Sequence, residues 1–460
     1  MKDATAFNDG TGCEVNKPQL SCIALVDIDS AYASMERVFR PDLGDRGIAI
    51  LSNNDGAVVA ANKAAKALGI RTGTPHFKVK DIIEKHRIAL FSSNYALYGD
   101  LSNRVMMAIE SMVPAYCQYS IDEAFLDLSG IERVEPLELF GRRLKQRIWD
   151  WTRLPVKVGI APTKTLAKVA SYGAKKYPAT GNVVDLSQRD RQRKLMALMD
   201  VGEIWGVGSR LRRQLNELNV HTALDLADQR PKDMRRYFSV NMERTVRELN
   251  GEQCFPLDDS SAQKQQIVVS RSFGERVTEF DEMFGAVTNY TVRAAEKLRS
   301  QGGTAQLFTL FIRTSPFSAD PQYSKSVTTR LPWPTDDTRA FLARARTLLE
   351  SIWRPGYRYA KAGVMLGEIA PLKQNQADLF QGDERPAGNP LLGLIDRMNK
   401  KGLDIRFAAQ AGPAGKMKQA RLSPHYTTRF SDVPIAKIKS ACIAVSSTFC
   451  DFVRSAKVQK

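Results

Sequence analysis

The stretch Tyr119-Ser-Ile-Asp-Glu-Ala-Phe125 places two adjacent carboxylates inside an apolar, β-rich run of the chain. The apolar and aromatic residues on both sides, from Val113 to Leu128, predict two strands joined by a tight turn that carries Asp122 and Glu123. Two ionised carboxylates this close repel each other, so one pKa rises unless a divalent cation neutralises both. Taken alone, such a pair most often forms a solvated acidic turn.

A third carboxylate follows the short apolar run Ile23–Val26, which predicts a buried strand. Asp27 stands where this strand ends and a helix begins, and Ser30 could cap that helix. Beside the acidic turn, Asp27 would complete the oxygen-rich ligand set that Mg²⁺ prefers. Two such ions are the usual device for phosphoryl or nucleotidyl transfer. On residue types alone, a metal site and a solvated turn remain equally open.

The block Asp27-Ile-Asp-Ser-Ala-Tyr-Ala-Ser34, followed by Ser120-Ile-Asp-Glu-Ala-Phe125, resembles the paired catalytic motifs of the Y-family, or translesion, DNA polymerases. Within that family the chain is most similar to the UmuC-like branch, the catalytic subunits of the bacterial SOS polymerase V. The resemblance spans roughly residues 20 to 430. Further segments that carry it are Phe39-Arg-Pro-Asp-Leu43, Leu51-Ser-Asn-Asn-Asp-Gly56, Phe91-Ser-Ser-Asn-Tyr95, Thr163-Lys-Thr-Leu-Ala-Lys168, Ser270-Arg-Ser-Phe-Gly-Glu-Arg276 and Lys361-Ala-Gly-Val-Met-Leu-Gly367.

The resemblance implies a multidomain α/β (α+β) fold with a palm, fingers, a thumb that contains a helix-hairpin-helix, and a β-α-β-β-α-β little-finger domain. The composition of the first twenty residues predicts a disordered N-terminal lead before these domains, and a basic C-terminal tail is expected after them. The predicted bounds are 1–20 for the lead, 21–34 and 96–185 for the palm, 35–95 for the fingers, 186–255 for the thumb, 264–370 for the little finger and 371–460 for the tail.

The same resemblance implies the reaction and its metal site. The chain would add deoxynucleotides to a primer 3′-hydroxyl on a template, with low fidelity, by nucleotidyl transfer that uses two Mg²⁺ ions, with Mn²⁺ as an alternative. The catalytic acids would be Asp27, Asp122 and Glu123, and Ile28 would join them as a metal ligand.

Several residues are predicted to contact the incoming nucleotide. A helix aromatic such as Tyr32 is most often structural, but in the family this position lies under the sugar and excludes a 2′-hydroxyl. Ala57 and Val58, in a hairpin around Asn53-Asn-Asp-Gly56, would roof the nascent base pair and leave room for a damaged template base.

Two lysines are predicted to contact the triphosphate. Lys66 keeps a positive charge where the family often has an arginine, whereas Lys63 departs from the family's tyrosine. Lys164, just past the strand Val156–Ile160, could place its ammonium on the β- and γ-phosphates and offset charge as pyrophosphate leaves.

The segment Val201–Arg210 introduces the predicted thumb motif. Gly206 and Gly208 lie between two helical stretches, where glycines let backbone N–H groups approach a phosphate. A lone G-x-G is most often an ordinary turn, but Arg210, Arg212 and Arg213 follow directly and favour sequence-independent binding of the DNA backbone.

A duplicated pattern of strands and helices follows and predicts the little finger. Its expected elements are Gln266–Ser272, Met283–Leu298, Gln306–Thr314, Lys325–Leu331, Thr338–Trp353 and Arg358–Gly367. Each basic residue on them is individually more often a solvated charge, yet the resemblance makes several of them DNA contacts. The predicted contacts are Arg271, Arg276 and Arg313, with Lys325 as a further candidate.

The charge balance supports a polyanionic partner. The 460 residues include 67 Lys and Arg against 50 Asp and Glu, a net charge of +17 and a pI near 9.6. No apolar run is long enough to span a membrane, and the first twenty residues lack a signal-peptide core, so we expect no membrane partner and a cytoplasmic location. Six scattered cysteines without a C-x-x-C predict neither a zinc site nor a disulfide framework.

The tail contains Gln376-Ala-Asp-Leu-Phe380, which resembles the peptides by which bacterial polymerases bind the sliding clamp. Gln376 would fill a small polar pocket, and Leu379 and Phe380 would anchor in an apolar groove. The other predicted partners are primer-template DNA and deoxynucleoside triphosphates. The resemblance alone adds a processed, UmuD-like dimer and a RecA filament.

Three alternatives remain beside this prediction. One is a self-sufficient lesion-bypass polymerase of the polymerase IV type. A second is a DNA-binding accessory subunit without catalysis, against which the intact acids argue. A nucleotide cyclase also places paired acids on a palm-like fold, but it would not need a helix-hairpin-helix or a little finger.

Overall fold

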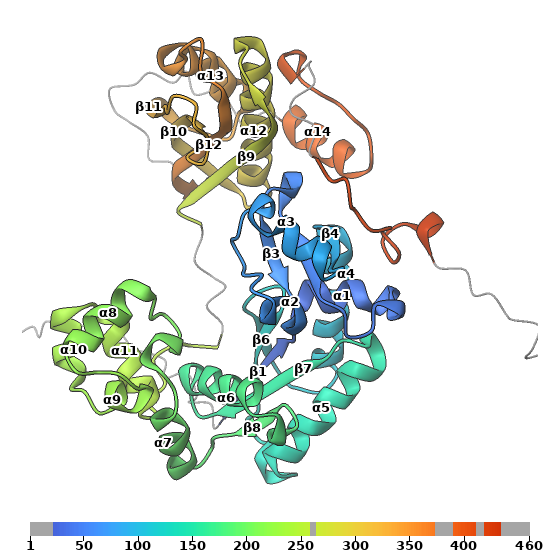
Figure 1. The fold of residues 1–460 in the computed structure, drawn as a ribbon. Coiled ribbons are helices and arrows are strands. Elements are labelled where there is room, and N and C mark those ends of the chain that lie inside the picture. Colours follow the sequence, from blue (N-terminus) through green and yellow to red (C-terminus); the bar gives the residue numbers. More distant parts are fainter. Residues whose placement is uncertain (1–21, 258–263, 373–389, 411–417, 434–460) are drawn as a thin grey trace, which may run out of the picture.

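The computed structural model describes residues 22–257, 264–372, 390–410 and 418–433 (Figure 1). Its centre is a five-stranded sheet in which β1 (Ile23–Ile28) lies between β6 (Glu123–Asp127) and β7 (Val156–Ala161) and is antiparallel to both. The edge strands are β5 (Tyr116–Gln118), beside β6, and β8 (Val183–Asp185), which is parallel to β7.

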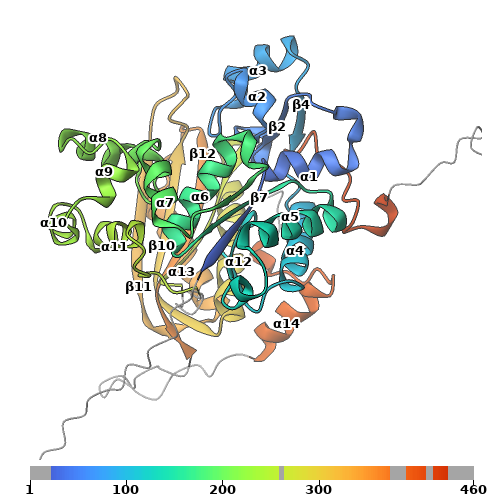
Figure 2. The same ribbon diagram turned by 90° about the horizontal axis from the view of Figure 1, so that it is seen from below.

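Both faces of β1 are buried, so its residues alternate between two apolar cores. One core includes Ala24, Val26 and Ile28 and is covered by α4 (Tyr95–Glu110) and α5 (Leu137–Thr152). The other includes Ile23 and Leu25 and is covered by α6 (Lys164–Lys176). Figure 2 shows α5 and α6 on the two sides of β7.

Helix α6 lies unusually close to the sheet at Gly159. A Cβ added there would stand 2.3 Å from the backbone nitrogen of Ser171, so only glycine allows this approach. The core under α6 continues into a helical unit, so the sheet and that unit share one core. Its elements are α7 (Arg189–Ala197), η5 (Val201–Glu203), α8 (Ser209–Glu217), α9 (Ala223–Ala227), α10 (Pro231–Tyr237) and α11 (Val240–Leu249).

A small three-stranded sheet follows α1 (Ala31–Phe39). Its middle strand β2 (Ile48–Leu51) pairs with β3 (Val58–Ala61) as the expected hairpin and, in parallel, with β4 (Ala89–Ser92). The helices and turns of this unit are η1 (Pro41–Leu43), η2 (Asn53–Asp55), α2 (Lys63–Ala67) and α3 (His76–Lys85).

Two helix starts differ from the sequence-based expectation. Ser30 occupies the N-cap position of α1 but does not cap it, because its backbone is left-handed and its hydroxyl donates to Asp29 Oδ1 at 3.3 Å. Helix α2 begins at Lys63, although the whole stretch from Ala60 to Leu68 is helix-prone in the sequence. The reason is that Asn62 is the N-cap and accepts a hydrogen bond from the Ala65 N–H at 3.0 Å.

The third unit is a separate antiparallel sheet in the order β11-β10-β12-β9, with two helices and its own core. The expected β-α-β-β-α-β order is present. The elements are β9 (Gln266–Val277), α12 (Phe280–Ser300), β10 (Gly303–Thr314), β11 (Ser324–Thr335), α13 (Thr338–Ile352) and β12 (Tyr359–Pro371).

The chain then forms α14 (Pro390–Lys400), which Arg299 and Asp396 tie to α12 with a 2.7 Å ion pair. Two further 3₁₀ turns are η7 (Ala408–Gln410) and η8 (Phe430–Asp432); η3 (Ile131–Arg133) and η4 (Pro178–Thr180) connect earlier elements. Across the described ranges, no helix combines the length and apolarity needed to cross a bilayer. Cys22, Cys117 and Cys254, the cysteines within those ranges, are free thiols.

Candidate active site

The three predicted acids meet at one end of the central sheet. The register of β1 and β6 sets Asp27 opposite Glu123, and Asp122 precedes Glu123 on the turn. The Ile28 N–H donates to the Asp122 carbonyl at 2.9 Å, which holds this turn against β1. Ser120 shapes the turn, because its Oγ donates to Asp122 Oδ1 at 2.5 Å and accepts from the Glu123 N–H at 3.0 Å.

The negative charge of the Asp27 carboxylate is incompletely compensated. Burial raises the pKa of Asp27 to about 6, against the opposing charge of Lys157 and with a further contribution from Glu123 and Asp122. An added cation would therefore be favoured here. Ile28, the fourth predicted ligand, can offer only its main-chain carbonyl oxygen.

Two lysines bind carboxylates of this site. Lys157 lies in register with Asp27 on β7, and its Nζ is 2.7 Å from Asp29 Oδ1. Lys168 Nζ is 2.9 Å from Glu123 Oε2. Within the described residues, no three His, Cys, Asp or Glu side chains are gathered closely enough to hold a metal as they lie. The donor set fits a hard divalent cation, provided that Glu123 exchanges Lys168 for the ion.

A cavity of about 300 Å³ opens beside Asp27 and Asp122. Tyr32 lines it, and the Tyr32 ring stacks on Tyr98 with centroids 4.6 Å apart and an interplanar angle of 16°. Lys66 and Lys175 line the same cavity. Partial desolvation and the neighbouring charge of Lys175 lower the pKa of Lys66, so two like charges face one space. That arrangement favours an anionic ligand.

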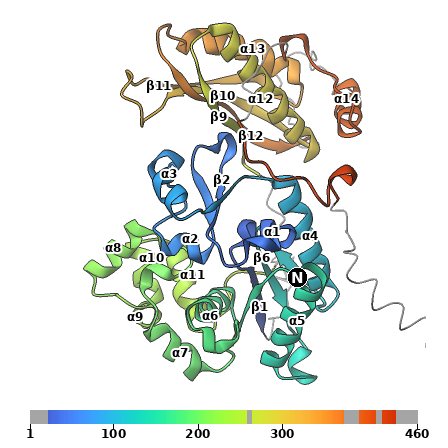
Figure 3. The same ribbon diagram turned by 45° about the vertical axis from the view of Figure 1, so that its right-hand side comes forward.

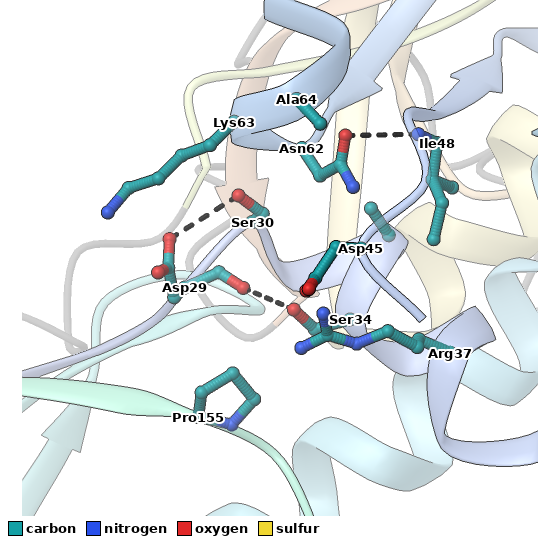
Figure 4. Close-up of a pocket in the computed structure, with 11 residues that line it drawn as sticks. Asp29, Ser30, Ser34, Arg37, Asp45, Ile48, Asn62, Lys63, Ala64 and Pro155 are labelled. Carbon is teal, nitrogen blue, oxygen red and sulfur yellow. Dashed lines mark hydrogen bonds between the residues drawn. The ribbon is translucent and has the colours of Figure 1, made fainter. Parts of the chain in front are cut away.

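Ser30 also lines a second cavity, of about 250 Å³ (Figure 4). Lys63 and Asp29 line this second cavity together with Arg37 and Asp45. The structure thus places Lys63 apart from Lys66, although the two belong to one short helix. The Ser34 hydroxyl donates a hydrogen bond to the Asp29 carbonyl at 2.6 Å, which ties the start of α1 to the end of β1.

Family models match most of the chain. One described as the impB/mucB/samB family matches residues 26–172, and one for the C-terminal domain of that family matches residues 264–379. Protein ImpB of Salmonella typhimurium is 48% identical over 421 residues, which cover 90% of this chain and 99% of that protein. Protein UmuC of Salmonella typhimurium strain LT2 is 48% identical over 416 residues, 89% of this chain and 99% of that protein.

The chain belongs to the impB/mucB/samB family, the UmuC-type Y-family DNA polymerases. A UmuC-type chain is the catalytic subunit of an error-prone translesion polymerase of the polymerase V type. Y-family polymerases generally use divalent metal ions. A domain of unknown function matches residues 389–436 of this UmuC-type chain.

Solved structures show the same fold. A Y-family DNA polymerase chimera, Dbh-Dpo4(243-245)-Dbh, aligns with a TM-score of 0.60 at 22% identity and covers 76% of this chain and 99% of its own. An insertion ternary complex of Dbh DNA polymerase aligns with a TM-score of 0.50 at 21% identity, covering 76% of this chain and 99% of its own. The expected polymerase fold with a separate little-finger domain is therefore confirmed for this UmuC-type chain.

Three predicted nucleotide contacts lie away from the cavity of this UmuC-type polymerase. Lys164 is buried under the sheet, where its Nζ donates to the Leu257 carbonyl at 3.2 Å and lies 4.9 Å from the Phe125 ring centroid. Val58 is buried in the core of the small sheet, and Ala57 faces the little finger. The small residues that line the cavity are instead Val59, Ala60 and Ala61.

The predicted DNA contacts of the UmuC-type chain are exposed. Gly206 has a positive φ of 89° and, with Gly208, leads into α8, but the first helix of the motif is only the 3₁₀ turn η5. Arg210 is exposed, whereas Arg212 pairs with Asp200 at 2.6 Å.

The little-finger arginines are also exposed. Arg271 and Arg276 lie on β9, and Arg313 lies on β10. Arg276 and Arg313 line a groove of about 570 Å³ between the little finger and η2. The clamp-binding prediction, Gln376, Leu379 and Phe380, and the N-terminal lead fall outside the described residues.

Sequence reasoning missed Lys157 and Lys175. Lys157 had a signal, because it is a charged residue inside the apolar strand Val156–Ala161. Lys175 lies seven residues after Lys168 on α6 and so shares its helical face, but only the folded chain shows that this side chain reaches the cavity.

Proposed function

We propose that the chain adds deoxynucleotides to a primer 3′-hydroxyl by two-metal nucleotidyl transfer, with Asp27, Asp122 and Glu123 as the catalytic acids. The observation that carries the proposal is the meeting of these acids beside a cavity that Lys66 and Lys175 also line. Carboxylates and ammonium groups around one cavity match a nucleoside triphosphate held through metal ions.

Asp27, Asp122, Glu123 and the Ile28 carbonyl would hold two Mg²⁺ ions, or Mn²⁺ in their place. When bound, such ions would lower the pKa of the 3′-hydroxyl and offset the negative charge of the departing pyrophosphate. Lys168 would hold the Glu123 carboxylate in the metal-free state, and its 2.9 Å ion pair would break on loading. Lys66 and Lys175 would bind the triphosphate, and Lys164 would join them only after releasing the Leu257 carbonyl.

Tyr32 would act as the gate that excludes a 2′-hydroxyl by contact with the sugar. Its ring lines the cavity and stacks on Tyr98, so the Tyr98 ring limits displacement of Tyr32 away from the sugar. In the hairpin, Val59, Ala60 and Ala61 would roof the nascent base pair in place of Ala57 and Val58, because they line the cavity.

We assign the palm to residues 21–34 and 96–185, the fingers to 35–95, the thumb to 186–255 and the little finger to 264–370, followed by the tail, 371–460. Gly206, Gly208, Arg210 and Arg212 would bind the DNA backbone in the thumb. Arg271, Arg276 and Arg313 would do so in the little finger, where their exposure leaves them accessible.

The partners are proposed from the family. Gln376, Leu379 and Phe380 would bind the sliding clamp, and a processed UmuD-like dimer and a RecA filament would complete a cytoplasmic polymerase V-type complex. The second candidate is a self-sufficient polymerase. A DNA polymerase IV of Oceanobacillus iheyensis is 25% identical over 84% of this chain, against 48% for the UmuC relative, which favours the polymerase V type.

Primer extension on an undamaged template tests the catalytic assignment. Asp122→Asn should abolish extension in Mg²⁺ and leave DNA affinity equal or higher, because one negative charge near the phosphates is lost. Asp127→Asn, at the far end of β6, the strand that follows Asp122, is the matched control and should extend primers normally. Normal extension by Asp122→Asn would remove the proposal. Extension by the unmodified chain without any partner protein would favour the self-sufficient type.

A further inference from the structure

The last described segment of the C-terminal tail packs against the fingers and palm. Residues 418–433, here called the C-terminal strap, run beside β4 and α4 (Figures 1 and 3). Leu422 forms a parallel bridge with Ser92, and the Ser92 N–H donates to the Arg421 carbonyl at 2.9 Å. The Ala420 N–H donates to Asp55 Oδ2 at 3.0 Å. The strap thus attaches to the edge of the small sheet.

Asn94 anchors the middle of the strap. Its Nδ2 donates to the Ser423 carbonyl at 3.2 Å, to the Ser423 hydroxyl at 3.0 Å and to the Pro424 carbonyl at 3.1 Å. Asn94 is also the N-cap of α4. One residue therefore joins the strap to the helix that carries Tyr98.

Helix α1 presents Tyr32, Glu36 and Phe39 at spacings of four and three residues, so they share one face. Two of them contact the strap. Phe39 stacks on Tyr426 with centroids 4.3 Å apart and an interplanar angle of 7°. The Ser423 hydroxyl donates to Glu36 Oε1 at 2.9 Å.

Glu36 links the strap to the wall of the cavity. It is 0% exposed, and its Oε1 also accepts the Tyr98 hydroxyl at 2.7 Å. Its other oxygen, Oε2, has no hydrogen-bond partner among the residues that the structure describes. Tyr98 is 0% exposed as well, and its ring stacks on Tyr32. An unbroken set of contacts therefore runs from Ser423 through Glu36 and Tyr98 to Tyr32.

We propose that the C-terminal strap sets the sugar selectivity of the polymerase, with Ser423, Glu36 and Tyr98 as positioning residues that hold the Tyr32 ring. The inference rests on the proposed function of Tyr32 as the gate. It gives a role to residues 418–433 within the segment that matches a domain of unknown function.

The physical reason is that the Glu36 carboxyl group is buried and has few partners. Burial raises its pKa, and the hydroxyls of Tyr98 and Ser423 oppose that effect. Removing the Ser423 hydroxyl leaves Tyr98 as the remaining partner of Glu36 Oε1, so the Glu36–Tyr98 contact can shift. A displaced Tyr98 no longer backs Tyr32, and the clash with a 2′-hydroxyl weakens. Addition of deoxynucleotides does not depend on that clash.

The test is single-nucleotide primer extension by the full-length chain, with each nucleotide offered in its ribo and deoxy forms. Ser423→Ala should raise the ribo-to-deoxy ratio roughly threefold to tenfold, the scale of one lost buried hydrogen bond, with the deoxy rate within about twofold. Tyr98→Phe, which keeps the ring, should act in the same direction. Ser423→Thr keeps the hydroxyl and should restore the ratio.

Ser431→Ala is the matched control, because it removes a serine hydroxyl from the exposed side of the same strap. Its ratio should not change. Tyr32→Ala reports on the gate itself. If Tyr32→Ala raises the ratio while Ser423→Ala and Tyr98→Phe do not, the inference fails and the gate assignment stands. If Tyr32→Ala leaves the ratio unchanged, both fail. If Ser423→Ala lowered the rates of ribonucleotide and deoxynucleotide addition equally, the strap would have only a structural role and the inference would be overturned.

Discussion

The Asp27→Asn substitution should stabilise the metal-free chain while abolishing polymerase activity. The pKa of Asp27 rises from 3.8 to about 6 in the folded state, because burial and the charges of Glu123 and Asp122 outweigh Lys157. A folded-state pKa above the unfolded value means that folding favours the protonated form. The ionised form therefore costs roughly 3 kcal/mol of unfolding free energy, and this cost is present in full above about pH 6.

Because asparagine carries no charge, the free energy of unfolding of the variant should be roughly 2–3 kcal/mol higher than that of the unmodified chain, measured in the chelator EDTA at about pH 7.5. The gain should shrink as the pH falls through about 6 and vanish below about 4, where Asp27 is protonated in both states. Mg²⁺ should reduce the difference in unfolding free energy between the variant and the unmodified chain, because it would stabilise only the chain that retains the carboxylate.

The assay is chemical denaturation followed by tryptophan fluorescence, with and without Mg²⁺, at several pH values. Asp127→Asn is again the control, because Asp127 lies at the opposite end of the β1–β6 pair, where its carboxylate accepts the Ser129 N–H at 2.8 Å. The Asp127→Asn substitution should not raise the free energy of unfolding. Equal or lower stability of Asp27→Asn in EDTA at about pH 7.5 would refute the claim that this carboxylate is undercompensated.

Three further outcomes are expected. Lys175→Ala should raise the KM for deoxynucleotides by roughly tenfold with a smaller change in kcat, because it removes one of two cations at the cavity; an unchanged KM in steady-state extension would exclude it from the triphosphate site. Arg276→Ala should weaken DNA binding equally for all sequences and reduce its salt dependence by about one unit of slope, measured by fluorescence anisotropy; sequence-dependent weakening would contradict a backbone contact. Alanine at both Leu379 and Phe380 should cost about 2 kcal/mol or more per anchor in clamp binding and leave clamp-free extension intact, and loss of both activities would contradict an exposed peptide.

The sequence predicted the central strands well because their signals are local. Ile23–Val26 is apolar without interruption, which is typical of a strand buried on both faces, and β1 has two cores. Of the acid pair, Asp122 lies on the predicted turn, whereas Glu123 is the first residue of β6 and pairs with Asp27. The order of strands and helices in the little finger was also predicted, and each predicted element overlaps an observed one.

Other features depend on contacts that no local pattern encodes. Lys164 follows the strand as expected, but packing against Phe125 and Leu257 turns it away from the cavity. The partners of Glu123 and Asp29 are fixed by the register of β7 and by α6, which the spacing of residues does not specify. The strap is the extreme case, because Ser423 meets Glu36 across 387 positions of the chain.

The shared core has a consequence for exchanging parts between related polymerases. The buried residues of the little finger, from Ile267 to Ile369, form a core of their own, so exchanging residues 264–372 as one piece leaves this core undivided. A hybrid joined near Leu186 would divide the layer in which Leu25 of the sheet and Leu249 of α11 both lie, and each half would expose apolar surface. Because the strap contacts the fingers, a hybrid that receives a foreign little finger should keep the host's own residues 418–433. The units of this chain that can be exchanged are therefore those with a core of their own, and the order of the units in the sequence does not identify them.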